Sequence, residues 1–327
     1  MTKAVVEGIG HSLPAKVMTN FDLEKLVETN DEWITQRTGI KERRVCDEGE
    51  TSASLGIEAA LESLKEAHVS AENVDIVICG TVTGDYHFPS TACLIQDAIG
   101  AKNAGAMDVG AACAGFIYAL DVAAAQIESG RYKTVLVVGV DVLTKFVDWT
   151  DRSTCVLFGD GAGAVVVTAH EDTDRGLIKT VLLSDGSGGK HIQCDLGGSK
   201  FPFGAKWSEG KSPYVFMNGS EVYRFAVNAM GDACCKVLDL AGLSTEDIDL
   251  FVPHQANLRI IQSAQKRLSL PDEKVFVNVQ KYGNTSGGSI PLGLYEAQKE
   301  GRLKRGDVVM TVGFGAGLVW GANLIRW

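Results

Sequence analysis

The segment AALESLKEAHVSAENVDIV (59–77) recurs later in the chain as ACCKVLDLAGLSTEDIDLF (233–251). The two copies align without a gap, and matched positions such as Asp75 and Asp249 keep one constant offset in numbering (249 − 75 = 174). Each copy combines apolar residues at helical spacing, a turn that begins with serine, and an apolar strand. The sequence therefore predicts one βαβ-rich unit that is built twice.

The repeat continues beyond these two segments. The strand-like stretch Val-Leu-Val-Val-Gly (135–139) matches Val-Met-Thr-Val-Gly (309–313) with the same offset. A Gly-Ala-Gly turn occurs at 161–163 and again at 315–317, but here the offset is smaller (315 − 161 = 154). The first half must therefore carry about 20 extra residues between its strand and its turn.

These matches divide the chain into two predicted halves, residues 1–170 and 171–327. Alternating strands and helices predict an α/β fold in which helices cover the sheets, and a duplicated fold is expected to bind its ligand between the halves. The alternative is a pair of unrelated α/β units whose similarity arose by chance. Residues 184–214 are rich in glycine and interrupt the pattern, so they predict a long loop of the kind that often serves as a lid.

Composition excludes several classes of function. The 327-residue chain has a formal net charge of −10, which disfavours nucleic acid as a partner because phosphate binding needs a basic surface. No apolar run is long enough to span a membrane, and residues 1–16 lack a signal-peptide hydrophobic region. The eight cysteines form no Cys-x-x-Cys pair, so neither a zinc site nor disulfides are expected. We predict a cytoplasmic protein without a membrane segment or a metal.

Cys113 lies where a predicted strand meets a predicted helix. The apolar strand 106–109 is followed by small residues, and apolar side chains then keep helical spacing from Phe116 until Ser129. Cys113 is therefore expected at a helix N-terminus, where free N–H groups and the helix dipole favour a thiolate. We interpret it as a nucleophile; the alternative is a cysteine that only packs in the core.

The offset of the repeat indicates two further polar residues, Asn284 and His254, as candidates for the same site. It carries Cys113 to Gly287, close to Asn284, so a symmetric fold would make Asn284 face the cysteine. His254 follows a predicted buried strand at the position that corresponds to Gly80, and α/β folds build their sites at strand ends. The alternatives are an asparagine that caps a turn and a histidine whose hydrogen bonds are satisfied within the core.

The glycine-rich turn at 313–317 has the sequence Gly-Phe-Gly-Ala-Gly. Glycines let the backbone approach a ligand closely, and N–H groups presented in this way form the oxyanion hole that acyl transfer requires. The alternative is a plain glycine hairpin.

The motifs around these residues resemble the β-ketoacyl-acyl-carrier-protein synthase III family nearly from end to end. The strongest matches are Asp31-Glu32-Trp33-Ile34, Arg37-Thr38-Gly39-Ile40, Gly110-Ala111-Ala112-Cys113-Ala114-Gly115, Phe158-Gly159-Asp160-Gly161-Ala162-Gly163, His254-Gln255-Ala256-Asn257 and Gly283-Asn284-Thr285-Ser286. The resemblance implies a thiolase fold, with two halves stacked as α-β-α-β-α layers, and a homodimer. It also implies a catalytic set of Cys113, His254 and Asn284. The implied oxyanion hole uses the backbone N–H groups of Cys113 and of Ala316, where many relatives have glycine.

The same resemblance implies sites for the substrates. Trp33 and Arg152 would sandwich the adenine of coenzyme A, with Thr29 and Arg37 nearby. Asn257 would lie along the pantetheine arm. Phe88 would reach the acyl pocket across the dimer interface and help to set the primer length.

A basic helix is predicted over residues 257–268, beginning beside His254. Its Arg259, Lys266 and Arg267 share one face, which is a local exception in an acidic chain and would attract an acidic carrier protein. The alternative is an ordinary solvated face. The resemblance implies carrier-protein docking at Arg224, Arg259, Lys266 and Arg267.

The implied reaction begins type II fatty acid synthesis. An acyl-CoA primer acylates Cys113, and malonyl-acyl carrier protein then loses carbon dioxide and condenses with the acyl group, without any cofactor. A degradative thiolase fits poorly because no cysteine follows Cys235, and the elongating synthases use a second histidine where this chain has Asn284. Three alternatives remain: a condensing enzyme or acyltransferase of secondary metabolism with another primer or acceptor, an acyltransferase or thioesterase that forms no carbon–carbon bond, and a non-catalytic partner protein of the same fold.

Overall fold

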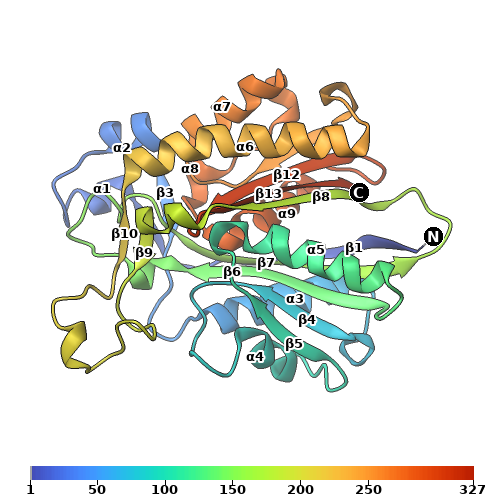
Figure 1. The fold of residues 1–327 in the computed structure, drawn as a ribbon, viewed down its shortest axis with the longest axis horizontal. Coiled ribbons are helices and arrows are strands. Elements are labelled where there is room, and N and C mark those ends of the chain that lie inside the picture. Colours follow the sequence, from blue (N-terminus) through green and yellow to red (C-terminus); the bar gives the residue numbers. More distant parts are fainter. Residues whose placement is uncertain (1) are drawn as a thin grey trace.

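Layers of helices and sheets alternate through the molecule. In the computed structural model, which describes residues 2–327, two sheets lie on either side of a central helical layer, and further helices cover their outer faces (Figure 1). The predicted α-β-α-β-α stacking is therefore confirmed. Within the described chain, no helix is long and apolar enough to cross a membrane.

The first sheet has the strand order β1-β7-β6-β4-β5. Strands β4 and β5 are parallel, β4 and β6 are parallel, and β7 runs antiparallel to both β1 and β6. The bounds are Lys3–Ser12 for β1, Ile76–Gly80 for β4, Gly105–Val109 for β5, Thr134–Val142 for β6 and Asp160–His170 for β7.

The second sheet has the strand order β8-β13-β12-β11, which corresponds to β1-β7-β6-β4 of the first sheet. Strands β11 and β12 are parallel, and the pairs β12–β13 and β13–β8 are antiparallel. Beside β11, where the first sheet has β5, a single parallel bridge joins Phe251 to Val275. The bounds are Gly176–Ser184 for β8, Leu250–Pro253 for β11, Val308–Gly315 for β12 and Val319–Arg326 for β13.

The major helices occupy corresponding places in the two halves. Figure 1 shows α5 and α9 between the sheets, α3 and α4 below the first sheet, and α6 and α7 above the second. Their bounds are Ser52–Ala67 for α3, Thr91–Ala98 for α4, Gly115–Glu128 for α5, Gly219–Ala241 for α6, Leu258–Leu268 for α7 and Ser289–Lys299 for α9. The division of the chain near residue 170 falls between β7 and β8 and stays a prediction.

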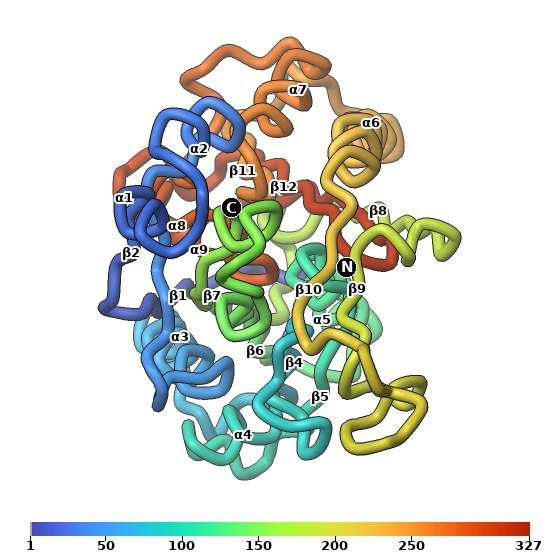
Figure 2. Tube along the Cα trace, turned by 90° about the vertical axis from the view of Figure 1, so that its left-hand side faces the viewer, coloured from blue at the N-terminus to red at the C-terminus, as the bar shows by residue number. Residues whose placement is uncertain are grey.

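The smaller elements gather largely at one end of the sheets, at the left of Figure 1 and facing the viewer in Figure 2. The short helices and paired strands are α1 (Asn20–Leu23), α2 (Asp31–Thr38), α8 (Val279–Tyr282), β2 (Val17–Thr19) with β3 (Glu42–Arg44), and β9 (Ile192–Cys194) with β10 (Val215–Met217). The 3₁₀ turns are η1 (Ala71–Asn73), η2 (Ala112–Ala114), η3 (Leu143–Phe146), η4 (Gly186–His191), η5 (Lys206–Ser208), η6 (Thr245–Asp247), η7 (Asp272–Lys274) and η8 (Ser286–Gly288).

The prediction of one long loop at 184–214 is therefore wrong in part. The segment contains η4, β9 and η5, because β9 finds its antiparallel partner β10 just beyond the predicted end of the loop. Because β10 lies outside residues 184–214, the glycine content of that segment alone does not reveal the strand pair.

Close packing of β4 against α5 positions the predicted nucleophile. A Cβ atom on Gly80 would lie 2.5 Å from the carbonyl carbon of Gly115, so only glycine lets the end of β4 meet the start of α5. Phe116 and Ile117 follow on α5 and are fully buried in the core between the sheets. Burial of such side chains contributes about 1.5–3 kcal/mol each, which fixes the helix start against the sheet.

Candidate active site

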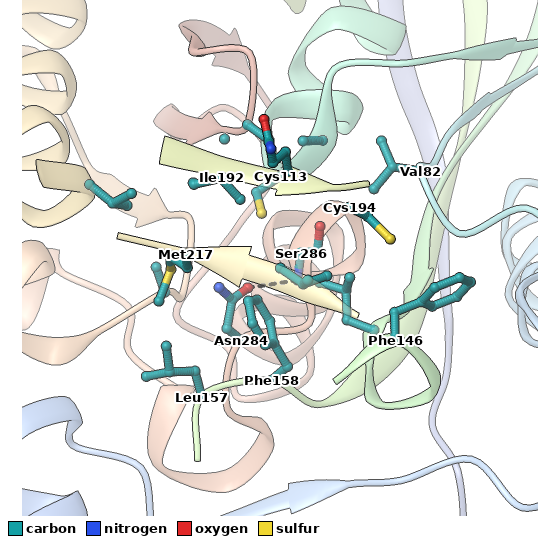
Figure 3. A pocket seen from close by; sticks show the side chains of 18 of the residues that line it. Val82, Cys113, Phe146, Leu157, Phe158, Ile192, Cys194, Met217, Asn284 and Ser286 are labelled. Carbon is teal, nitrogen blue, oxygen red and sulfur yellow. Dashed lines mark hydrogen bonds between the residues drawn. The ribbon is translucent and has the colours of Figure 1, made fainter. Parts of the chain in front are cut away.

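A cavity of about 1590 Å³ opens at the end of the molecule where the smaller elements gather. Cys113, His254 and Asn284 all line it, so the structure brings the three predicted catalytic residues together. Figure 3 shows the sulfur of Cys113 directed toward the side of the cavity that holds Asn284 and Ser286. The 3₁₀ turn η2 contains Cys113, and the turn η8 follows Asn284. The two turns are separated by the offset of the sequence repeat, so they are equivalent parts of the two halves.

Cys113 lies in η2, immediately before α5, with its backbone N–H beside the second half of the repeat. A Cβ atom on Gly315 would lie 2.6 Å from the Cys113 nitrogen, so glycine is required for β12 to pass this close. Ala316 follows and lines the same cavity. Left-handed backbone angles in this region fall on Ala112 and Gly317 and not on Ala316, so the alanine adopts an ordinary conformation.

Burial acts against the thiolate that the helix start was expected to favour at Cys113. Burial raises the pKa of the Cys113 thiol to about 12, although the neighbouring Ser286 hydroxyl acts in the opposite direction. Burial disfavours a charged sulfur because it removes the water that would stabilise the charge. Cys113 is therefore a thiol at neutral pH, and the helix dipole helps only as charge develops on the sulfur during attack.

His254 follows β11, and its imidazole is almost completely buried. Its backbone N–H donates to the carbonyl of Val312 over 2.7 Å, and its Nδ1 lies 2.6 Å from the hydroxyl of Ser289. Burial lowers the pKa of His254 to about 3, so the ring is neutral at physiological pH. Its Nε2 has no hydrogen-bond partner among residues 2–327 and belongs to a side chain that lines the cavity.

Asn284 sits in a turn that both halves of the chain hold in place. Its backbone N–H donates to Leu157, and its carbonyl accepts from Gly159. Its side-chain Oδ1 accepts from the Ser286 N–H over 2.8 Å, which leaves the Nδ2 hydrogens for the cavity (Figure 3). The asparagine thus closes a local turn, as one alternative held, and also presents donors to the predicted site.

Three residues predicted to bind coenzyme A lie together and line the cavity. The guanidinium groups of Arg37 and Arg152 lie 4.7 and 5.3 Å from the centroid of the Trp33 ring. A base stacked between Trp33 and Arg152 would need about 7 Å, because each stacking contact takes about 3.5 Å. Arg152, which also donates to the Glu28 carbonyl, therefore occupies the stacking position in this structure.

Three other predicted binding residues differ in how they relate to the cavity. Thr29 does not line the cavity. Phe88 is 87% exposed and also lies outside it, so any acyl pocket that it enters belongs to another chain. Asn257 does line the cavity, but its Oδ1 caps α7 by accepting from Arg259 and its Nδ2 donates to the Arg37 carbonyl. Its amide thus makes two hydrogen bonds within the chain, and the capping preference of asparagine could have indicated the bond to Arg259.

The four predicted docking residues divide into two groups. Arg224 and Arg259 line the cavity mouth, where Arg224 pairs with Glu221 and Arg259 stacks over Tyr223. Lys266 and Arg267 lie further along α7, and Arg267 pairs with an aspartate of α6. The predicted inward stripe of α7 is confirmed by the burial of Ile260, Ile261, Ala264 and Leu268.

Sequence reasoning missed Asp141, a fully buried carboxylate at the end of β6. It accepts hydrogen bonds from the hydroxyls of Thr81 and Thr83 and from the backbone N–H of Gly287. It thereby ties the first half of the chain to the turn that carries Asn284. An aspartate within an apolar strand was the available signal, because a buried charge needs several donors to be tolerated.

Comparisons with known proteins point to one family. Two models of the 3-oxoacyl-(acyl-carrier-protein) synthase III family, one of them its C-terminal part, match residues 107–186 and 238–327. A β-ketoacyl-(acyl-carrier-protein) synthase III of Bacillus cereus is 51% identical over 320 residues, which is 98% of this chain and 97% of the relative. The crystal structure of a 3-oxoacyl-(acyl-carrier-protein) synthase III from Aquifex aeolicus superposes with a TM-score of 0.92 at 48% identity, covering 99% of this chain and 100% of the other. A priming β-ketosynthase of a polyketide pathway is only 35% identical, with a TM-score of 0.91 over 98% of this chain and 96% of the other.

Proposed function

The chain belongs to the β-ketoacyl-(acyl-carrier-protein) synthase III family, and we propose that its Cys113, His254 and Asn284 divide that family's reaction between acyl transfer and condensation. The protein is a condensing acyltransferase of the thiolase fold. It joins an acyl-CoA primer to malonyl-acyl carrier protein and so initiates type II fatty acid synthesis. The observation that supports the residue assignment is one cavity that combines a cysteine with two neutral donor side chains.

In the first step, Cys113 attacks the thioester carbonyl of the primer. A bond forms between its sulfur and the acyl carbon, the bond to the coenzyme A sulfur breaks, and the cysteine proton ends on the released coenzyme A thiol. The backbone N–H groups of Cys113 and Ala316 are proposed to bind the oxygen of the tetrahedral intermediate. Covalent catalysis replaces one difficult exchange with two easier ones.

In the second step, malonyl-acyl carrier protein loses its carboxylate as carbon dioxide. The electron pair of the broken carbon–carbon bond passes into an enolate, whose thioester oxygen is proposed to accept from His254 Nε2 and Asn284 Nδ2. Each preorganised donor at such an oxygen contributes about 2.7–4 kcal/mol. The enolate carbon then attacks the acyl-cysteine, the bond from the acyl carbon to sulfur breaks, and Cys113 leaves as a thiolate that takes a proton from water to restore the thiol. These steps involve no net oxidation, so we propose that no metal or redox cofactor takes part.

Product analysis tests this function. The protein, incubated with acyl-CoA primers of different length and branching and with malonyl-acyl carrier protein, should release carbon dioxide and yield a β-ketoacyl-carrier protein two carbons longer than the primer. A free acid as the only product would instead indicate a thioesterase. Condensation that needs another acceptor would indicate the secondary-metabolism alternative.

We propose further that the protein works as a cytoplasmic homodimer. Strand β5 is the edge of the first sheet, and Tyr86 and Phe88 nearby are 65% and 87% exposed. An exposed strand edge is a template for pairing, and exposed aromatic residues are typical of interfaces. Sedimentation equilibrium should give twice the chain mass of 34.9 kDa. A monomer at micromolar concentration would contradict the proposal.

Carrier-protein docking should depend on Lys266. Because Arg259 lines the cavity mouth, reversing its charge disturbs both substrates, whereas Lys266 lies further along α7. Lys266→Glu should therefore raise KM for malonyl-acyl carrier protein about three- to tenfold at low salt, since one surface charge contributes about 1 kcal/mol. KM for the acyl-CoA primer should stay unchanged.

The matched control for Lys266→Glu is Lys65→Glu on α3, an exposed lysine outside the first sheet. Steady-state kinetics at low and high salt measure both KM values. An equal rise for both substrates, or the same rise in the control, would show that the face of α7 is merely solvated surface.

A further inference from the structure

Ser289 is the first residue of α9 and is almost completely buried beside His254. We propose that Ser289 is a positioning residue that holds His254 in the tautomer with its proton on Nε2. This inference rests on the proposed function, because it explains how His254 comes to act as a donor. Ser289 itself does not line the cavity.

The hydrogen bonds around Ser289 determine which way the proton points. Its Oγ lies 2.6 Å from His254 Nδ1 and 3.4 Å from the backbone nitrogen of Gln255. The Gln255 N–H is an obligate donor, so it occupies one lone pair of the hydroxyl oxygen. In the part of the chain that the structure describes, Nδ1 is the only acceptor within hydrogen-bond distance of the Ser289 hydroxyl.

The opposite arrangement carries a penalty. If Nδ1–H donated to Ser289, the hydroxyl hydrogen would be left without an acceptor in a buried place. An unsatisfied buried donor is costly, so the hydroxyl donates and Nδ1 accepts. The ring proton must then reside on Nε2, because a neutral imidazole carries only one.

The tautomer decides what His254 offers to a substrate. With the proton on Nε2, the ring presents a donor to the cavity, where no residue of the described chain satisfies it. An enolate oxygen needs a donor at this place, whereas the other tautomer would present a lone pair and repel the charge. The ring also cannot gain a second proton at neutral pH, because burial keeps it uncharged. Ser289 thus converts a buried histidine into a fixed neutral donor.

Nitrogen NMR of the full-length protein tests the tautomer directly. With ¹⁵N-labelled histidine, His254 should show a pyrrole-type shift at Nε2 and a pyridine-type shift at Nδ1, and the His254→Ala variant identifies its signals among those of the six histidines. In Ser289→Ala the two signals should move toward tautomer averages. A pyrrole-type Nδ1 in the wild-type protein would overturn the inference.

Kinetics of the two half-reactions provide the second readout. Ser289→Ala should slow decarboxylation of malonyl-acyl carrier protein by about 10- to 100-fold, the size of the effect of removing a partner that orients a metal-bound histidine. Acylation of Cys113 by acyl-CoA should stay within about twofold, which also shows that the variant folds. Ser289→Thr keeps the hydroxyl and should recover most of the rate.

The outcomes separate this inference from the proposed function. Wild-type decarboxylation in Ser289→Ala, with an unchanged His254 spectrum, would overturn the role of Ser289. Wild-type decarboxylation in His254→Ala would instead overturn the function assigned to His254, whatever the tautomer. If Ser289→Ala loses both half-reactions together, the wild-type spectrum alone decides.

Discussion

Incubation with an acyl-CoA primer should add one acyl group to the wild-type chain and none to a Cys113→Ala variant. Cys113 lies at the start of a helix and lines the cavity, and its backbone nitrogen packs closely against Gly315. A carbonyl bound there would meet the sulfur and the proposed oxyanion donors together. Loss of the nucleophile should reduce condensation by at least about 10³-fold, as in other covalent enzymes. Intact-protein mass spectrometry measures the adduct.

Cys194 provides the control, because it lines the same cavity and is exposed. Its sulfur donates to the Pro213 carbonyl and belongs to the β9–β10 hairpin rather than to a helix start. Cys194→Ser should therefore be acylated like the wild-type protein. An acyl group recovered on Cys194, or on any residue of Cys113→Ala at the wild-type rate, would contradict the assignment.

The duplicated fold was predictable because matched residues perform the same structural task. Asp75 accepts from the backbone N–H of Thr134 at the start of β6, and Asp249 accepts from that of Val308 at the start of β12. Each aspartate N–H also donates back to the carbonyl of the same partner. The two partners are themselves related by the offset of the repeat, so the sequence repeat reflects a repeated long-range contact and not only repeated helix propensity.

The same offset located the turns that carry two of the proposed catalytic residues, but it did not reveal their chemistry. It predicted correctly that Asn284 would share a cavity with Cys113, because η2 and η8 are equivalent. It gave no information on the protonation of Cys113, which depends on how the other half of the chain buries the sulfur. Helix position is a local property that a sequence shows, whereas desolvation arises from packing between distant segments.

The partners of the two supporting residues could not be predicted from the sequence, for a related reason. Asp141 meets Gly287 across 146 residues of chain, and Ser289 meets His254 across 35. Ser289 is an ordinary serine at a helix start, and the aspartate in the apolar strand β6 signals a buried charge without indicating which groups donate to it. Only the fold shows that their partners are the turn of Asn284 and the ring of His254.

Loss of either donor should separate the two half-reactions. His254→Ala and Asn284→Ala should each slow decarboxylation of malonyl-acyl carrier protein by about 10²- to 10³-fold, because each removes one preorganised donor from the enolate oxygen. Acylation of Cys113 should change by less than about tenfold, since its oxyanion is proposed to bind backbone N–H groups that remain. Release of carbon dioxide and the rate of acyl-enzyme formation measure the two steps separately.

Asn284→Asp distinguishes a donor from a residue that only shapes the turn. Aspartate keeps an oxygen that can accept from the Ser286 N–H, as Asn284 Oδ1 does over 2.8 Å, but it lacks the Nδ2 hydrogens. If the donor matters, Asn284→Asp should lose decarboxylation at least as fully as Asn284→Ala, because a carboxylate also repels the enolate. If only the turn matters, Asn284→Asp should decarboxylate like the wild-type protein, and Asn284 would then have no direct part in the condensation.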